Sequence, residues 1–518
     1  VAAVSSVNST FDLKLNDFTS RQISVSMMGA DNYQVGRGSN VVLSYPPQPG
    51  PGVNFNLTYN KNSTSARGYL NYLEVNVRRN LKMTGSVMFF RNADYLKTGY
   101  YSKYTLTDAN QNVQIWDITD QSNIRKIAAS RNGDALEFTD TNDEVKQYVA
   151  IDPTAKSAIT LEPTIIGTIP NQDLHALTAA DMIIITHPDF VSQSKRLANA
   201  HLEKDNLKVH VVTTEQVYNE FSSGTPDATA YRWVMKMFYD RAIAAGNPDL
   251  MPKYLLLFGR GTFDNRGIIN NSGDNLVLTY QADESLHKVY SYVTDDYFGF
   301  LDNNEGLEIT SHKVDVGIGR FPVVTVKHAE DVVNKSIEYM NNKTKGNWKN
   351  QLTFVADDGD NSMHIGQADS IAQTIFKSNP EFQLQKIYLD SYLQETSASG
   401  DSYPLAKKRL QSLISSGSFM LNFTGHASAA GWTDEKILLT NDVNELFNKK
   451  LPIWIGATCD FVLFDSKDIS AGENVVLNPV GGGIGNFSAA RVVYAAQNER
   501  INRYFSTDLF TRRDGKYP

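Results

Sequence analysis

The most informative stretch of this 518-residue chain is Leu451-Pro-Ile-Trp-Ile-Gly-Ala-Thr-Cys459-Asp-Phe461, which contains its only cysteine. Residues 453–457 predict a short apolar strand that delivers Cys459 at its carboxyl end. A second apolar run, 418–423, is followed by Thr424-Gly425-His426. A thiol and an imidazole at the ends of two neighbouring strands form a candidate nucleophile and base. The imidazole would either take the thiol proton or hold a thiolate in an ion pair. The alternative is a buried, inert cysteine, the commoner role of a single cysteine.

Apolar strands alternate with amphipathic helices from about residue 170 onward. Strands are predicted at 182–187, 207–212, 254–258, 313–318, 351–356, 384–389, 417–423, 452–457 and 483–487, and helices at 191–204, 227–244, 326–342, 363–377, 403–415 and 497–511. This alternation predicts an α/β fold with a mostly parallel sheet covered by helices on both faces. Sites in such sheets lie beyond the carboxyl ends of the strands, where His426 and Cys459 both fall. A change of segment at 343–348 divides the region into two α/β halves, 166–346 and 347–518.

Residues 1–165 have a different pattern. Short runs of alternating apolar residues recur at 23–27, 41–45, 53–57, 70–77 and 113–118, and turn-forming clusters at 46–52 and 131–133 separate some of them. This pattern predicts an all-β, sandwich-like module. The module does not concentrate titratable groups, so we expect it to dock partners or support the rest of the chain.

The composition excludes several classes of function. A formal charge of −8 without a basic stripe argues against a nucleic-acid partner. The glycine-rich runs 259–261 and 481–485 lack the spacing of phosphate or dinucleotide loops, and the histidines lack zinc-peptidase spacing. The chain starts without methionine or a signal peptide, so we expect it to be part of a longer secreted protein.

A carboxylate-rich loop, Val355-Ala-Asp-Asp-Gly-Asp-Asn361, follows another predicted strand. Asp358, just before Gly359, is a candidate to hold His426 in its working tautomer. A helix N-cap or a turn explains the same residue equally well. Asp357 and Asp360 would equally serve as ligands of a cation.

An acyl intermediate also needs hydrogen-bond donors for its developing oxyanion. The backbone amides of Cys459 and Ala427 are the candidates. Gly425 would permit the sharp exit from the strand that presents them.

Two further groups of residues are candidates for binding. Residues after the glycine-rich run would wall a substrate pocket, although a plain core strand explains them nearly as well: Asn486, Ser488 and Arg491. A second group offers clustered carboxylate oxygens of the kind that Ca²⁺ prefers, in a stretch that also suits a hairpin turn: Asp295, Asp296, Asp302 and Glu305.

The sequence resembles the gingipain cysteine peptidases over roughly 175–518. The resemblance rests on Asn422-Phe-Thr-Gly-His426-Ala-Ser428 and Ala457-Thr-Cys459, and also on Ile318-Gly-Arg320-Phe321 and Val293-Thr-Asp295-Asp-Tyr-Phe-Gly299. It implies a caspase-like three-layer sandwich in two halves. It also implies Cys459 as nucleophile, His426 as base and Asp358 as the orienting acid.

The resemblance carries further expectations. It implies that the chemistry needs no cofactor, and that a structural Ca²⁺ is present, as in the gingipains. The chain has Ala427 where the family has glycine, and no residue matches the acidic S1 residue of the gingipains. We therefore expect a small or uncharged P1 residue in the substrate rather than arginine or lysine.

Within this family, the β-rich N-terminal region and residues 289–322 are most similar to the signal peptidases of type IX secretion. This similarity implies an enzyme that cleaves C-terminal signal domains from secreted cargo and transfers the acyl product to an amine of lipopolysaccharide. It also implies a surface location at the outer membrane, held by secretion-system partner proteins. The competing hypothesis is a non-catalytic, peptidase-like scaffold that docks secretion partners.

Overall fold

The computed structural model describes residues 1–518 except 19, 47–49, 51, 156–163, 166, 270–273, 399 and 518. The chain divides into two compact units, one formed by 1–71 together with 172–518 and the other by 72–171. The region predicted as one N-terminal module therefore contributes to both units. No helix in the described part of the chain is long and apolar enough to cross a membrane.

Residues 1–71 form two small antiparallel sheets. In one, β2 (Ser9–Leu15) lies between β3 (Arg21–Val25) and β5 (Phe55–Asn60), and in the other β1 (Ala2–Val4) lies between β4 (Arg37–Gly38) and β6 (Arg67–Tyr69). Alternate residues of β2 point inward, so that Phe11 and Leu13 pack with Ile23 and Val25.

The unit 72–171 is also antiparallel. One sheet has the order β10-β9-β13-β7 and the other β11-β12-β8. The strands are β7 (Val87–Arg91), β8 (Tyr101–Leu106), β9 (Gln114–Asp117), β10 (Arg125–Ile127), β11 (Ser130–Asn132), β12 (Ala135–Thr141) and β13 (Gln147–Ile151). Aromatic rings fill its core, with Tyr104 stacked on Phe138 at 4.7 Å between centroids. The predicted strands at 41–45 and 70–77 are wrong, because neither segment pairs as a strand.

The first α/β half contains a four-stranded parallel sheet of order β15-β14-β16-β19. Its strands are β14 (Met182–Thr186), β15 (Val209–Thr213), β16 (Tyr254–Phe258) and β19 (Gly317–Phe321). Helices α3 (Thr214–Phe221) and α4 (Thr229–Ala244) cover one face, and α2 (Val191–Asp205) and α5 (Val326–Met340) cover the other. A short hairpin, β17 (Tyr280–Gln281) with β18 (Val293–Thr294), lies between β16 and β19 in the sequence. The strand expected at 313–318 begins only at Gly317.

The second half contains a five-stranded parallel sheet of order β21-β20-β24-β28-β29. Its strands are β20 (Gln351–Ala356), β21 (Gln383–Tyr388), β24 (Met420–Thr424), β28 (Ile453–Ala457) and β29 (Gly485–Ser488). The second half also contains short antiparallel strands: β22 (Glu395–Ser397), β23 (Gly400–Ser402), β25 (Ala427–Ser428), β26 (Gly431–Trp432) and β27 (Leu438–Leu439).

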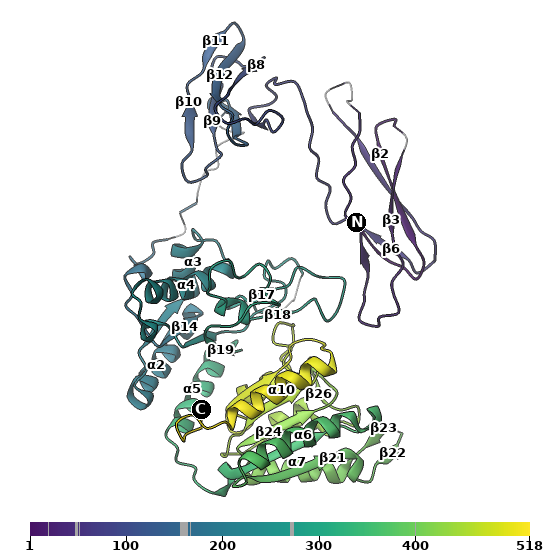
Figure 1. The fold of residues 1–518 in the computed structure, drawn as a ribbon, viewed down its shortest axis with the longest axis vertical. Coiled ribbons are helices and arrows are strands. Elements are labelled where there is room, and N and C mark those ends of the chain that lie inside the picture. The colour runs from purple at the N-terminus through teal and green to yellow at the C-terminus, as the bar shows by residue number, and fades with distance from the viewer. Residues whose placement is uncertain are drawn as a thin grey trace. The chain divides into compact units, whose positions relative to one another are not determined.

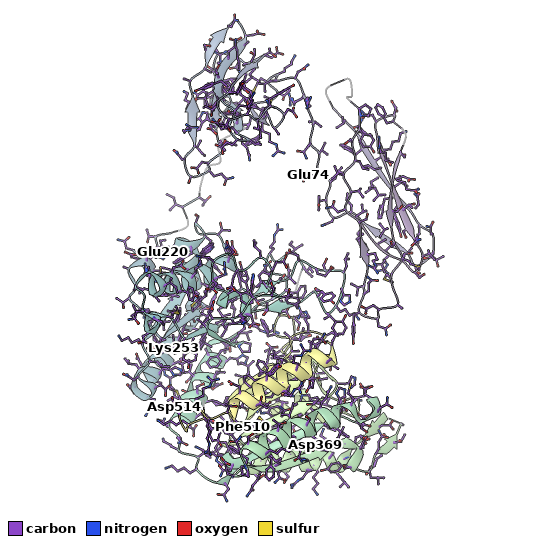
Figure 2. The ribbon with its side chains drawn as sticks, viewed as in Figure 1. Glu74, Glu220, Lys253, Asp369, Phe510 and Asp514 are labelled. Atoms are coloured by element: carbon purple, nitrogen blue, oxygen red, sulfur yellow. The ribbon has the colours of Figure 1, made fainter. Side chains whose placement is uncertain are left out.

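Helices cover both faces of this second sheet. On one side α6 (Met363–Ser378) and α10 (Ala495–Leu509) pack side by side (Figure 1). Phe510, which follows α10, is labelled in Figure 2. Its ring centroid lies 4.9 Å from that of Phe382. On the other side lie α7 (Pro404–Ser416), α8 (Thr440–Asn444) and α9 (Ala471–Leu477). The predicted three-layer α/β architecture is confirmed, whereas the short helices α3, α8 and α9 were not predicted.

A buried ion pair joins the two halves. Arg260, which follows β16, donates from Nε to the Glu473 carboxylate of α9 over 2.7 Å, and both side chains are almost completely buried. Arg260 also donates to the carbonyls of Ser466 and Asp468. Val476 and Leu477 of α9 lie in the core that α2 and α5 form, so the halves share one apolar interior.

Candidate active site

Three neighbouring strands of the second half end at one edge of the sheet. In the register of β20, β24 and β28, Ala356 pairs with Thr424 and Thr424 with Ala457. His426 and Cys459 each lie two residues beyond these paired positions, on strands that run about 4.8 Å apart. The Gly425 amide donates to the Ala457 carbonyl over 3.2 Å and so continues the ladder past the strand ends. The structure therefore brings the predicted nucleophile and base to the same edge.

The carboxylate that holds His426 belongs to Asp357, the first residue after β20. One carboxylate oxygen, Oδ2, accepts from the backbone amide of His426 at 2.9 Å and lies 3.0 Å from Nδ1 of its ring. Asp357 is 4% exposed, so its charge is poorly screened by solvent. Two hydrogen bonds to one residue fix both the position and the tautomer of the imidazole, with the proton on Nδ1 and Nε2 free to act as a base.

Asp358 does not take the orienting role expected from the sequence. Its carboxylate accepts a hydrogen bond from the Tyr403 hydroxyl at 2.8 Å. Burial and this carboxylate together raise the pKa of Tyr403. Both aspartates follow β20, and of the two only Asp357 forms hydrogen bonds with His426.

Gly425 is required for this arrangement. A Cβ atom on Gly425 would lie 2.3 Å from Cβ of Asp357. The absence of a side chain thus lets the carboxylate pack against the backbone that leads into His426. This is a stronger constraint than the sharp strand exit expected from the sequence.

The imidazole of His426 lies between two carboxylates. The hydrogen bond that the His426 ring donates to Asp357 raises the pKa of His426, and the nearby charges of Asp357 and Asp360 act in the same direction against partial burial. Nε2 lies 3.4 Å from Oδ2 of Asp360. The side chain is 61% exposed, so a substrate can reach it.

The thiol of Cys459 is half-buried. Burial raises its pKa, and Sγ donates a long hydrogen bond of 3.8 Å to the Val493 carbonyl. Cys459 and His426 both lie in the described part of the chain, and no hydrogen bond joins the thiol to the imidazole ring. The thiol and the imidazole therefore lie at the same edge of the sheet but do not hydrogen-bond to each other.

The predicted oxyanion donors lie beside the pair. Ala427 starts β25 directly after His426, and Cys459 is the second residue after β28. The amide of Gly425, by contrast, is used by the Ala457 carbonyl. The roles of the Ala427 and Cys459 amides as oxyanion donors stay predictions.

The residues predicted to wall a substrate pocket make internal contacts. Arg491 forms an ion pair with the buried Asp465, with Nη1 2.6 Å from the carboxylate, and also donates to the Ser291 carbonyl. Ser488 donates to the Gly456 carbonyl at 3.0 Å, and Asn486 to the Gly472 carbonyl at 2.9 Å. Oδ1 of Asn486 is buried without a hydrogen-bond partner among the described residues. The role of the three residues in a substrate pocket stays a prediction.

The four carboxylates expected to bind Ca²⁺ do not meet. No three of them, all described residues, bring oxygen atoms within 4.8 Å of one another. Asp295 forms a two-pronged ion pair with Arg320, and Asp302 accepts from the Tyr239 hydroxyl. Glu305 accepts from the Asp302 amide, and Asp296 lies at the surface. Calcium binding by these four carboxylates stays a prediction.

A thiol, an imidazole and a buried carboxylate at the carboxyl edge of a caspase-like sheet are the parts of a cysteine peptidase. Residues 175–518 match the model of Peptidase family C25, and the chain belongs to this family. The gingipain resemblance seen in the sequence is thereby confirmed.

Two solved structures are similar to this chain. The dimeric latent PorU of Porphyromonas gingivalis is 28% identical with a TM-score of 0.51, and the match covers 65% of this chain and 33% of that one. The Arg-specific cysteine proteinase gingipain R (RgpB) is 18% identical with a TM-score of 0.49, over 66% of this chain and 69% of that one. The chain thus spans about a third of the length of PorU. A search of curated protein sequences gave no match.

Proposed function

We propose that this peptidase removes C-terminal signal domains from secreted cargo and passes the acyl group to an amine. The observation that carries the peptidase part is the edge geometry, with Asp357 holding His426 two residues beyond the register that also positions Cys459. The cargo and the transfer step rest on the similarity to PorU at 28% identity. The acceptor would be an amine of lipopolysaccharide, at an outer-membrane surface where secretion-system proteins hold the enzyme.

The reaction begins with general-base catalysis. Sγ of Cys459 attacks the scissile carbonyl carbon while Nε2 of His426 takes the thiol proton. The C–N bond breaks, the leaving amine takes the proton back from Nε2, and a thioester remains on Cys459. An incoming amine then attacks the thioester, gives its proton through His426 to the departing sulfur, and forms a new amide. With water in place of the amine, the product is a free carboxylate.

The raised pKa of Cys459 favours this route over a resting thiolate–imidazolium pair. A resting ion pair would need a lowered thiol pKa and direct contact with the ring. Here burial keeps the thiol neutral, and its hydrogen bond goes to a carbonyl. The thiol therefore needs His426 to accept its proton during the attack.

Mass spectrometry of the processed cargo tests the proposal. A cargo protein with its C-terminal signal domain is incubated with the enzyme, with and without a primary amine. We expect a shortened chain whose new C-terminus carries the amine when the amine is present and a free carboxylate when it is absent. Cys459→Ala should release neither product while keeping the same unfolding transition.

The lack of a thiol–imidazole hydrogen bond favours one alternative, a non-catalytic scaffold. A scaffold predicts no processing by the unaltered chain and thiol alkylation only after denaturation. Processing by Cys459→Ala at the rate of the unaltered chain would remove the catalytic assignment. Cleavage that never yields an amide would leave a hydrolase and refute the transfer step.

A further inference from the structure

Three side chains with nitrogen and oxygen ligand atoms converge beside the catalytic pair. One atom from each of Asp360, His364 and His426 lies within 4.8 Å of the others. We propose that these residues bind a divalent cation of the zinc type, and that the bound ion withdraws His426 from catalysis. The binding part stands on the geometry below, whereas the inhibitory part rests on the proposed function.

The spacing of the ligand atoms suits a tetrahedral ion. Oδ2 of Asp360 lies 3.2 Å from Nε2 of His364 and 3.4 Å from Nε2 of His426. Zinc binds nitrogen and carboxylate oxygen at about 2.0–2.2 Å in tetrahedral sites, which places neighbouring ligand atoms roughly 3.3–3.5 Å apart. The distances from Oδ2 of Asp360 to Nε2 of His364 and to Nε2 of His426 are close to this separation.

His364 is the observation that points to a ligand. It is 6% exposed, and its Nε2 has no hydrogen-bond partner among the described residues. The 3.2 Å approach to Asp360 therefore lacks the alignment of a hydrogen bond. A buried nitrogen without a partner is costly to leave unsatisfied. A metal ion would use the lone pair that the protein leaves free.

The outer nitrogens of both histidines are held as ligands require. Nδ1 of His426 lies 3.0 Å from the Asp357 carboxylate, and Nδ1 of His364 lies 3.4 Å from Oε1 of Gln367. Metal-binding histidines almost always donate this second N–H to an acceptor, which fixes the tautomer with the other nitrogen unprotonated. Both rings thus present Nε2, and they stand nearly perpendicular with centroids 5.0 Å apart.

The ligand set selects the class of ion. Two imidazoles and one carboxylate suit zinc and similar transition metals, whereas Ca²⁺ and Mg²⁺ require oxygen ligands. Two other clusters in the described ranges lack these features. In Asp173–His175–Glu220 the imidazole already bonds Glu220 at 2.7 Å, and the group Asp357–Asp358–Glu435 has carboxylates only.

Binding of a metal ion at this site and proton transfer by His426 exclude each other. The ion would occupy the lone pair of His426 Nε2, the atom that takes the proton from Cys459 in the proposed reaction. Because the same nitrogen binds a proton at low pH, binding releases that proton and strengthens as the pH rises. The ion would therefore act as a reversible inhibitor that a chelator removes.

Direct binding measurements test the site without relying on activity. Metal-free Cys459→Ala protein is titrated with Zn²⁺ by calorimetry, in competition with a chelator of known affinity. We expect one tight equivalent, weakened at least about 100-fold in Asp360→Asn and His364→Ala, since loss of an outer-shell partner alone reduces affinity about 10–100-fold. Asp360 is exposed, so its variant decides the matter even where the buried His364 variant fails to fold.

A matched control comes from α2. His201 also faces an aspartate four residues away, with Nδ1 2.8 Å from Asp205, but without a third ligand. His201→Ala should bind Zn²⁺ as the parent does. Equal affinity in parent and Asp360→Asn would overturn the site. Tight binding by the unaltered chain that disappears in the Cys459→Ala parent would overturn it too, because the thiol would then be a required ligand.

Activity provides the second arm. With the unaltered chain, Zn²⁺ should stop cargo processing at the concentration that fills the calorimetric site, and a chelator should restore it. Unchanged processing with the site filled would overturn the inhibitory role. A chain that binds Zn²⁺ as expected but processes no cargo in metal-free buffer would refute the proposed function and still confirm the site.

Discussion

Replacing Asp357 by asparagine tests whether Asp357, rather than the Asp358 expected from the sequence, orients His426. Asparagine has nearly the same shape, and its amide oxygen can still accept from the backbone amide of His426. The change removes the charge that lies 3.0 Å from Nδ1. The fold should therefore persist while the support of the imidazole is lost.

The expected size of the effect follows from that hydrogen bond. A hydrogen bond to a charged group contributes about 1.5–3 kcal/mol, and about 1.36 kcal/mol corresponds to a tenfold change in rate. We expect kcat/KM to fall about 10–150-fold in Asp357→Asn. The exposed side of the His426 ring screens part of the interaction, so the lower half of this range is the better expectation.

The assay compares neighbouring residues. Hydrolysis of a chromogenic peptide is measured for the parent, Asp357→Asn and Asp358→Asn, together with chemical unfolding of each. Asp358→Asn disturbs the hydrogen bond from Tyr403 and should change kcat/KM less than threefold. A larger loss in Asp358→Asn than in Asp357→Asn would refute the reasoning and restore the role expected from the sequence.

Three further predictions concern His426, Gly425 and Arg260. Because Asp357 and Asp360 raise the pKa of His426 above its usual 6.5, kcat/KM should increase with pH only above that value, and Asp360→Asn should move the rise to lower pH. Gly425→Ala should lower the unfolding free energy by about 1–3 kcal/mol and also the activity, since its Cβ would displace Asp357. Arg260→Met should lower the unfolding free energy by about 3–5 kcal/mol, because it leaves the Glu473 carboxylate buried without a counter-charge, with hydrogen bonds from Ser470 alone.

Each of these predictions has its own contradicting outcome. A pH profile that rises below pH 6.5 in the parent would mean that His426 is not the group that titrates. Full activity of Gly425→Ala would show that the loop can move away from Asp357. For the ion pair, Arg513→Met at the exposed pair with Asp508 is the control and should change the unfolding free energy by less than about 0.5 kcal/mol. Equal effects of the two arginine variants would contradict the argument.

The sequence predicted the parallel sheet and the positions of His426 and Cys459 because strand ends are visible as the end of an apolar run. The strands at 453–457 and 420–424 are short and almost completely buried, so few other registers are available. The structure places Asp357 rather than Asp358 against His426, and the sequence could not distinguish two adjacent carboxylates that both follow the same strand. Apolar patterning fixes a strand end only to within a residue or two.

Contacts between distant segments were not predictable from local patterns. Arg491 looked like part of a pocket, but its partner Asp465 lies in a loop with no periodic signal. Arg260 sits in a glycine-flanked run that suggested a phosphate loop before it was rejected, and nothing near it indicates Glu473 of α9. His364 was also missed, because Asp360 precedes α6 on a segment with positive φ and the four-residue spacing gave no helical signal for the pair.

The pairing of Arg260 with Glu473 has a practical consequence for anyone who expresses pieces of this protein. A recombinant fragment that starts at residue 347 carries Asp357, His426 and Cys459, yet it lacks the guanidinium that neutralises Glu473. It also presents Val476 and Leu477 to water. Such a fragment should aggregate or stay unfolded, so inactivity of the isolated piece would say nothing about the chemistry of the intact enzyme.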